Sequence, residues 1–173
     1  MVANILIVIA ILFAIPFIIA LFVKKDYAAD RTIIIDRPKH EVFDYIKYLK
    51  NQDNYSKWAM MDTDLKKEFR GTDGAEGFVY AWEGKKSGAG EQEIISITEG
   101  ERITTELRFI KPFPSVAHGY IATEAHTDHS TKVTWGLFGK NHYPRNIINL
   151  FIGGLMGKDL DVGLNNLKRV LEK

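Results

Sequence analysis

The chain of 173 residues contains no cysteine. This absence excludes a disulfide framework, zinc sites built on cysteine, iron–sulfur clusters and catalysis by a thiol. The sequence also lacks the nucleophile-elbow, P-loop, dinucleotide-binding and His-Glu-x-x-His patterns, so none of these enzyme classes is indicated. A chain of this length can nevertheless bury enough apolar surface to fold as one domain without covalent or metal cross-links.

Neither sign of charge is in excess, because 23 lysines and arginines face 22 aspartates and glutamates, for a net charge of +1. Nucleic-acid binding favours a strongly basic face, and here the basic residues are dispersed among acidic ones. We therefore expect no nucleic-acid partner. Charge is missing altogether from the first 23 residues, so the average composition describes two unlike parts.

The amino-terminal segment from Val2 to Val23 reads VANILIVIAILFAIPFIIALFV, with Asn4 and Pro16 the exceptions to its apolar character. At about 1.5 Å per residue, a helix of this length reaches about 33 Å and can cross a hydrocarbon core of about 30 Å. Proline is tolerated in such helices as a kink. The segment predicts a single transmembrane anchor over residues 1–23.

Two other interpretations of this segment are a cleaved signal peptide and a buried core helix. A signal peptide needs a basic stretch before a shorter apolar core, and no lysine or arginine precedes this run, although Ala28-Ala29 resembles a weak cleavage site. Lys24, Lys25 and Arg31 follow the run. The positive-inside rule then places the carboxyl-terminal domain in the cytoplasm, with the opposite orientation as the alternative.

After a short polar linker, expected over residues 24–30, residues 31–173 predict one α+β domain. Residues 31–36 form a β-branched run typical of a strand, Pro38 suits the first turn of a helix, and residues 51–58 indicate a second short helix or structured loop. Turn-rich stretches then separate six further strand signals, which lie at residues 65–70, 78–83, 92–98, 102–110, 116–126 and 132–138.

From Pro144 to the end, apolar residues recur at three- and four-residue steps, which predicts a long helix. The links between the strands are mostly of hairpin length, so the sheet should be antiparallel. The expected fold is a helix-grip fold, in which a curved antiparallel sheet wraps round the carboxyl-terminal helix after one transmembrane helix. A strongly curved sheet that one helix cannot fill leaves room for a cavity between them.

Three segments resemble the START-like, helix-grip superfamily, specifically the SRPBCC polyketide cyclase/dehydrase-like group. They are IIIDRPKHEVFDYIKYLKNQDNYSKW, GEQEIISITEGERITTELRFIKP and MGKDLDVGLNNLKRVLEK, which are distributed over the domain predicted at residues 31–173. The resemblance implies a hydrophobic ligand pocket between the last helix and the sheet. It implies no particular reaction, because members of such a superfamily include carriers and enzymes alike.

Aromatic residues alternate along two predicted strands and are candidates for the walls of this pocket, because aromatic walls suit sterols, acyl chains and flat ring systems. Core packing is the alternative role for each of them. The candidate ligand-binding residues, including two from the last helix, are Phe78, Tyr80, Trp82, Trp135, Phe151 and Leu155.

Two polar residues, His118 and Tyr120, lie on one face of a predicted strand and are weak catalytic candidates. Inside a cavity, the imidazole of His118 could act as a general base and Tyr120 could position a carbonyl or phenol. Because the opposite face of this strand is small and apolar, the pattern favours the interpretation that His118 and Tyr120 are ordinary surface residues.

The cluster of Glu124, His126, Asp128 and His129 contains metal-ligating side chains but falls across a predicted hairpin turn. Polar residues are expected in such a turn for conformational reasons, so we predict neither a metal site nor a cofactor. The favoured function is a membrane-anchored domain that binds a hydrophobic small molecule or lipid. The alternatives are a cyclase, dehydratase or hydrolase acting on a membrane-derived substrate, and a non-catalytic interaction module.

Overall fold

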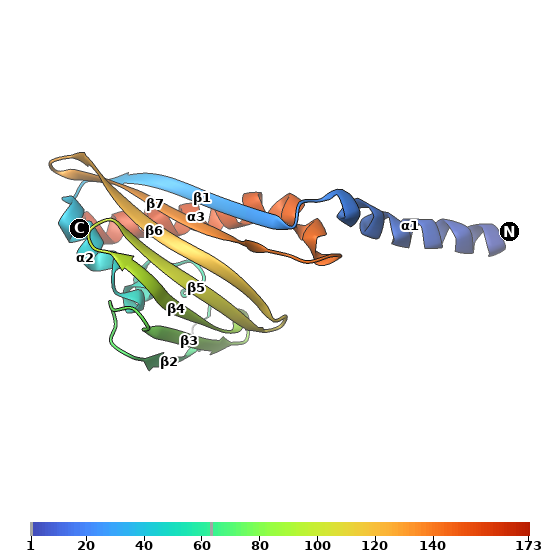
Figure 1. Cartoon of the computed structure of the whole chain (residues 1–173), viewed down its shortest axis with the longest axis horizontal. Helices are drawn as coiled ribbons and strands as arrows, with labels where there is room; N and C mark the ends of the chain where they lie inside the picture. Colours follow the sequence, from blue (N-terminus) through green and yellow to red (C-terminus); the bar gives the residue numbers. More distant parts are fainter. Residues whose placement is uncertain (1, 63) are drawn as a thin grey trace.

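The computed structural model describes residues 2–62 and 64–173, and Figure 1 shows the order of its elements. A long helix, α1 (Val2–Phe22), precedes the folded domain. The domain begins with β1 (Asp26–Ile35), α2 (Lys39–Ile46) and the 3-10 helix η1 (Leu49–Asn54). The elements that follow are β2 (Lys66–Arg70), β3 (Val79–Gly84), β4 (Gly88–Thr98), β5 (Arg102–Lys111), β6 (Ser115–Thr127), β7 (Ser130–Lys140), the 3-10 helix η2 (Arg145–Ile148) and α3 (Asn149–Leu171).

The strands form one antiparallel sheet in the order β1-β7-β6-β5-β4-β3-β2. Strands β2 to β7 follow one another as neighbours because each link between them is short, and β1 closes the row by pairing with β7. The sheet curves around α3, which runs along its concave side beside β1 (Figure 1). The predicted helix-grip fold, with its curved antiparallel sheet and long carboxyl-terminal helix, is confirmed.

Alternation of side chains decides which face of the sheet is buried. On β6, Ala117, Gly119 and Ile121 are buried, whereas His118 and Tyr120 between them are partly exposed. The small, apolar residues therefore face the interior and the polar ones face outward.

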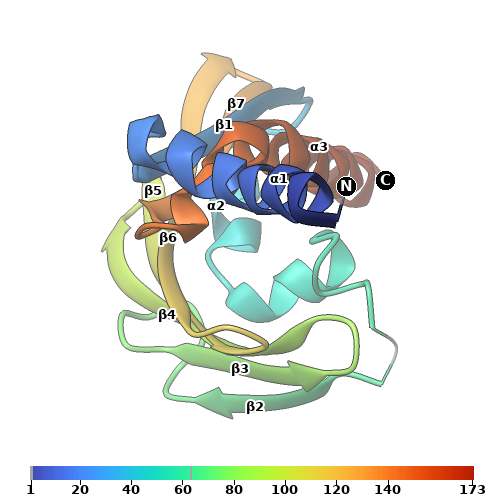
Figure 2. The same ribbon diagram turned by 90° about the vertical axis from the view of Figure 1, so that its right-hand side faces the viewer.

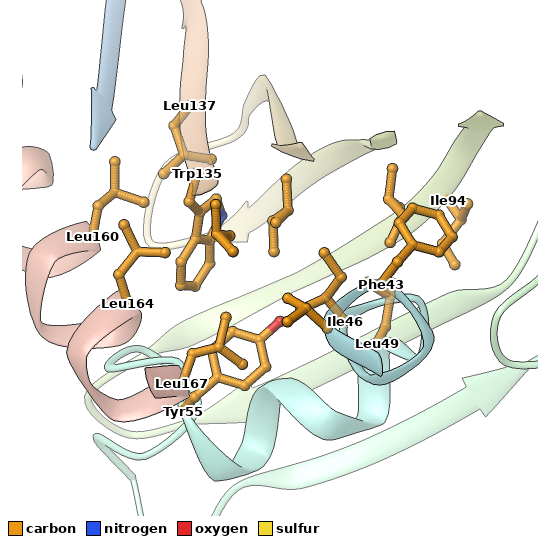
Figure 3. Close-up of a cluster of buried hydrophobic side chains, with 14 of the residues drawn as sticks. Phe43, Ile46, Leu49, Tyr55, Ile94, Trp135, Leu137, Leu160, Leu164 and Leu167 are labelled. Atoms are coloured by element: carbon orange, nitrogen blue, oxygen red, sulfur yellow. The ribbon is translucent and has the colours of Figure 1, made fainter. Parts of the chain in front are cut away.

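The main hydrophobic core lies where α2 and the second half of α3 meet the concave face of the sheet. Figure 3 shows Leu160, Leu164 and Leu167 of α3 directed toward Trp135, with Phe43 and Ile46 of α2 farther along the same cluster. Leu160, Leu164 and Leu167 are almost completely buried. Their spacing of three and four residues places them on one side of the helix, which explains why this half of α3 is held firmly.

One glycine of α3 is required by this packing. A Cβ atom added to Gly163 would lie 2.6 Å from the Trp135 ring, whereas one added to Gly154 would meet nothing within 4 Å. We expect Gly163→Ala to lower the free energy of unfolding by about 1–3 kcal/mol through overpacking. The matched change Gly154→Ala should raise it by about 0.5–1 kcal/mol, because alanine favours a helix. Urea unfolding followed by circular dichroism measures both, and equal effects would contradict this account.

Most of the segment predicted as a linker is strand. Strand β1 begins at Asp26, which pairs with Lys140 of β7, so residues 26–30 belong to the sheet and not to a polar connection. The prediction missed them because Asp26 and Asp30 interrupt the apolar pattern. Both side chains are exposed at this edge strand, where charge is tolerated.

Helix α1 is long and apolar enough, by length and composition, to cross a membrane. It projects from one end of the domain (Figure 1), and its described side chains between residues 11 and 19 are exposed. Ala20, near its carboxyl end, is buried against the domain.

Two asparagines of the domain bind backbone carbonyl groups at the end of α1 and in the residues directly after it. The amide nitrogen Nδ2 of Asn146 donates to the carbonyl oxygens of Ala20 at 2.6 Å and Val23 at 2.8 Å. The Nδ2 of Asn149 donates to those of Lys24 at 2.9 Å and Lys25 at 2.8 Å. The last carbonyls of a helix have no partner within the helix, and Asn146 supplies one for Ala20. The other acceptors lie in the three residues that follow α1. Asn146 and Asn149, hereafter the asparagine clamp, therefore hold the backbone where α1 ends.

Candidate ligand-binding site

A cavity of about 310 Å³ lies on the concave face of the sheet. Its wall comes from β3 to β7 near one end of the sheet, where Phe109 of β5 pairs with Ser115 of β6, and Ala117 of β6 pairs with Gly139 of β7. The pairing of Asp26 with Lys140 belongs to this same end. The cavity therefore occupies the end of the domain from which α1 leaves, while the packed core fills the other end.

The sheet side of the cavity is mainly apolar. Two aromatic rings in it, Trp82 and Phe109, meet edge to face with centroids 6.0 Å apart. Small residues at Ala117 and Gly119 leave the space open beneath them. The lining residues contributed by the sheet are Tyr80, Trp82, Gln92, Leu107, Phe109, Ala117, Gly119, Trp135 and Leu137.

The opposite wall was expected to be the last helix, but α3 contributes Met156 and the segment between α2 and β2 contributes the other residues of this wall. The packed half of α3 reaches the sheet directly and leaves no space there, so the cavity forms where residues 52–61 cover the sheet. Its opening is marked by lining residues that also reach solvent, including Met61 and Lys86. The lining residues from this segment are Gln52, Ser56, Trp58, Ala59, Met61 and Leu65.

Polar groups of two aromatic lining residues are hydrogen-bonded to neighbouring groups. The Tyr80 hydroxyl donates to the Asp53 carboxylate at 2.7 Å, and Lys67 pairs with the other oxygen of Asp53 at 2.7 Å. Burial, together with this hydrogen bond, raises the pKa of Tyr80 well above its usual range, so the phenol keeps its proton. The Trp82 indole nitrogen donates to the Ser87 carbonyl at 3.3 Å. These contacts fix the aromatic walls in place.

A second polar chain crosses the floor of the cavity. The Gln92 amide donates to the Thr105 hydroxyl at 3.2 Å, and that hydroxyl donates to the Gly119 carbonyl at 3.4 Å. Among the described lining residues, Tyr80 and Lys86 are the ionisable ones. Such a site offers apolar surface and a few hydrogen-bonding groups, which is suited to holding a ligand.

The structure divides the six predicted ligand-binding residues into three groups. Tyr80, Trp82 and Trp135 line the cavity. Phe78 lies instead in the packed core, stacked on Phe69 with centroids 6.2 Å apart.

Phe151 and Leu155 do not line the cavity but are exposed on the outer side of α3. The apolar residues in the first half of α3 occupy more than one side of the helix, so their spacing alone could not select the sheet-facing side. Ile152 and Met156, one position later in each case, turn inward.

The two weak catalytic candidates lie on the convex face of the sheet. His118 stacks on Phe138 with centroids 5.3 Å apart, and its Nε2 lies 3.7 Å from the Glu106 carboxylate. The cavity is on the opposite face of β6, where Ala117 and Gly119 point. A ligand in the cavity therefore does not contact the His118 imidazole.

Tyr120 has a packing role on the same convex face. Its ring covers Gly136, where an added Cβ atom would lie 2.3 Å from the ring. The guanidinium of Arg102, on β5, lies 3.9 Å from the centroid of the Tyr120 ring. These contacts account for an aromatic residue at this position without acid–base chemistry.

The polar cluster near the β6–β7 turn is exposed. Glu124 forms an ion pair with Lys132 at 3.1 Å, and the backbone nitrogen of His129 donates to the Thr127 hydroxyl at 3.3 Å. Over residues 2–62 and 64–173, no group of three or more histidine, aspartate and glutamate side chains is arranged to hold a metal ion.

Sequence reasoning missed the wall formed by residues 52–61. Gln52 and Ser56 are buried there, and Trp58 meets Trp135 edge to face with centroids 5.8 Å apart. Residues 51–58 were predicted as a short helix or structured loop, and η1 covers part of them, but no side chain of this segment was assigned to the pocket. The one signal available was the concentration of large apolar residues, Trp58, Met60 and Met61, between a helix and an edge strand.

The family model described as polyketide cyclase/dehydrase and lipid transport matches residues 28–172. The chain belongs to this family. A search of curated protein sequences finds no match. The family membership agrees with the curved sheet, the long final helix and the apolar cavity between the sheet and its covering segments.

Solved structures share the fold of this family member. Norcoclaurine synthase from Thalictrum flavum, in complex with dopamine and hydroxybenzaldehyde, has a TM-score of 0.64 at 8% identity, covering 89% of this chain and 91% of that one. Ara h 8.0201 has a TM-score of 0.58 at 11% identity, covering 84% and 97%. A protein from Nitrosospira multiformis has a TM-score of 0.58 at 19% identity, covering 82% and 94%. At these identities the likeness establishes the fold.

Proposed function

We propose that the protein is a membrane-anchored domain that binds a hydrophobic small molecule or a lipid. The observation that carries this function is the apolar cavity of about 310 Å³ at the α1 end of the sheet. The family to which the chain belongs is described by cyclase, dehydrase and lipid-transport functions, and each of these requires a site for an apolar ligand.

The size and lining of the cavity limit the class of ligand. A volume of about 310 Å³ is at the small end of the range for ligand pockets, which suits a small ring system or part of an acyl chain. The aromatic rings of Trp82, Phe109 and Trp135 provide flat apolar contacts, and the amide of Gln92 provides one polar contact for a carbonyl or hydroxyl group.

The asparagine clamp supports an anchor that is retained in the mature protein. The Asn146 side chain is 1% exposed, and cleavage near residue 28 would remove both carbonyl oxygens to which its amide donates. An amide buried without partners is costly. Lys24 and Lys25 directly follow α1, so the positive-inside rule places the ligand-binding domain in the cytoplasm.

Filling the cavity from β6 tests the proposed site. We expect Ala117→Phe to weaken uptake of an apolar fluorescent probe at least tenfold, because Ala117 lines the cavity and a phenyl ring there occupies the ligand's space. The neighbouring change Val116→Phe adds a similar ring on the exposed side of the strand and should leave uptake unchanged. Probe titration of full-length protein in detergent micelles measures both.

Native mass spectrometry of the same preparations, followed by lipid extraction, identifies any ligand that is retained. The proposal requires the unaltered protein to carry an apolar molecule or take up the probe, and Ala117→Phe to reduce this. An unaltered protein that is empty and takes up no probe would overturn it, and equal uptake by the two variants would move the site elsewhere.

A further inference from the structure

Large apolar side chains are exposed at the end of the domain from which α1 projects. Phe113, in the β5–β6 turn, is 65% exposed, and Tyr143, before η2, is 46% exposed. At the start of α3, Leu150 is 58% and Phe151 63% exposed. These four residues come from three separate segments, and exposed apolar residues at one end of a domain indicate an interaction surface.

Cationic side chains surround these four residues. Lys24 and Lys25 follow α1 directly, while Lys140 ends β7 and Arg145 begins η2. The Arg145 guanidinium lies 5.2 Å from the centroid of the Phe113 ring, which joins the β5–β6 turn to η2. Asp26 lies in the same region, 3.8 Å from Lys140.

The asparagine clamp holds this surface beside the end of α1. Asn146 binds α1 at Ala20, and Asn149 binds Lys24 just after the helix, from the same short segment that carries Arg145, Leu150 and Phe151. An open groove of about 600 Å³ between α1 and α3 is lined by Ile19 and Phe22 on one side and by Leu150 on the other. Figure 2 views the molecule from the side on which α1 projects, with η2 and the start of α3 next to the helix.

We propose that this surface binds the anionic face of a lipid bilayer. The docking face is defined by Phe113, Tyr143, Leu150, Phe151, Lys24, Lys25, Lys140 and Arg145. Aromatic and aliphatic side chains enter the boundary between headgroups and acyl chains, and lysines and arginines around them attract anionic lipids. This partner is favoured over a protein because the apolar surface is continuous with the exposed apolar side chains of α1. The proposal rests on the membrane anchoring proposed above.

Docking at this face places the ligand cavity at the bilayer. The cavity occupies the α1 end of the sheet, and its opening includes Lys86 of the β3–β4 turn, which lies at that end because Gly84 pairs with Gly88 there. An apolar ligand then moves between the lipid and the cavity over a short distance, with little exposure to bulk water. The domain would thus be held against its own membrane in one orientation, and would not move freely about the end of α1.

The absence of native cysteine allows a direct test with single-cysteine variants of the full-length chain. Phe113→Cys, Phe151→Cys, Glu99→Cys and Leu12→Cys are each labelled with an environment-sensitive fluorophore. Each protein is reconstituted into vesicles of phosphatidylcholine with 30% phosphatidylserine that contain nitroxide-labelled lipids, a composition of roughly the anionic content that attracts basic surfaces. Glu99 lies in the β4–β5 turn at the far end of the sheet, and Leu12 lies within α1.

We expect the probes at residues 12, 113 and 151 to be quenched by the nitroxide lipids and the probe at residue 99 to remain unquenched. Quenching at residue 12 without quenching at 113 and 151 would overturn the docking face while leaving the anchor intact. Absence of quenching at residue 12 as well would overturn both the anchor and the docking face. Quenching at residue 99 equal to that at 113 would also overturn the docking face, since the whole domain would then contact lipid without preference.

Removal of charge tests the preference for anionic lipid. Lys140→Gln combined with Arg145→Gln should reduce quenching at residues 113 and 151 at least twofold, with no change at residue 12. The matched pair Arg169→Gln and Lys173→Gln removes the same charge at the carboxyl end of the chain and should have no effect. Unchanged quenching in the first pair, or equal quenching in vesicles without phosphatidylserine, would contradict an electrostatic contribution to the docking face.

Discussion

Asn146→Asp is expected to lower the free energy of unfolding by about 3 kcal/mol at neutral pH, although the two side chains have nearly the same shape. The substitution replaces a buried amide that donates to two carbonyl oxygens, at 2.6 and 2.8 Å, with a carboxylate that repels them. A buried polar group that loses its partners costs about 1–3 kcal/mol, and a charged one costs more. Urea unfolding of the full-length protein in micelles measures the change.

The deficit of Asn146→Asp should shrink as the pH is lowered. Burial and the facing carbonyl oxygens raise the folded-state pKa of the new carboxyl above its unfolded value of about 3.9. Between these two pKa values the folded state binds more protons than the unfolded state, so the stability of the variant falls as pH rises. The deficit relative to the unaltered protein is therefore smallest near pH 4 and largest above the folded-state pKa.

Asn165→Asp is the matched control for this effect. The Asn165 amide also donates to a helix carbonyl, that of Asp161 at 2.7 Å, but the side chain is exposed. We expect a change of less than about 1 kcal/mol there, since water replaces the lost partner. Equal effects at residues 146 and 165 would mean that the asparagine clamp does not hold α1 to the domain.

Trp135→Ala is expected to lower the free energy of unfolding by about 3–5 kcal/mol. The indole is almost completely buried between α3 and the segment after η1, and its ring meets Tyr55 edge to face with centroids 5.6 Å apart. It also forms part of the cavity wall. Its removal therefore takes away core contacts and enlarges the cavity in a single step.

Urea unfolding should be followed by circular dichroism, because removal of a tryptophan changes the fluorescence signal whether or not stability changes. Trp135→Phe should recover about half of the loss, because a smaller ring still fills part of the space. Trp58→Ala should cost about 1–2 kcal/mol, since Trp58 is only partly buried and loses less apolar area. A cost at residue 135 no larger than that at residue 58 would contradict its place at the centre of the core.

The predicted strands agree closely with those observed because their side chains alternate along extended backbone. In β6, the small residues Ala117 and Gly119 identified the buried face, and the structure places His118 and Tyr120 on the convex face, away from the cavity. This agreement is expected where a period of two separates interior from exterior. The start of β1 at Asp26 could not be found in this way. Residues 26–30 do not form an uninterrupted apolar pattern, and they are in a strand because they pair with β7.

The first half of α3 shows where periodicity alone is insufficient. Phe151 and Leu155 satisfy the same spacing rule as Leu160 and Leu164, but they face outward. A helix that is apolar on several sides offers more than one stripe, and contact with the sheet selects among them. The Met156 side chain reaches the cavity only because the packed half of α3 fixes the rotation of the whole helix.

The sequence by itself determined the apolar first helix, the antiparallel fold with its closing helix, and the chemistry that a chain without cysteine lacks. These follow from local composition and from side-chain periods, which each segment carries on its own. Tertiary structure alone decided that residues 52–61 cover the cavity, that Asn146 and Asn149 bind the backbone at and just after the end of α1, and that the cavity lies at the end of the sheet from which α1 projects. Each of these depends on contacts between segments distant in the chain, because burial and hydrogen bonding are set by which surfaces meet.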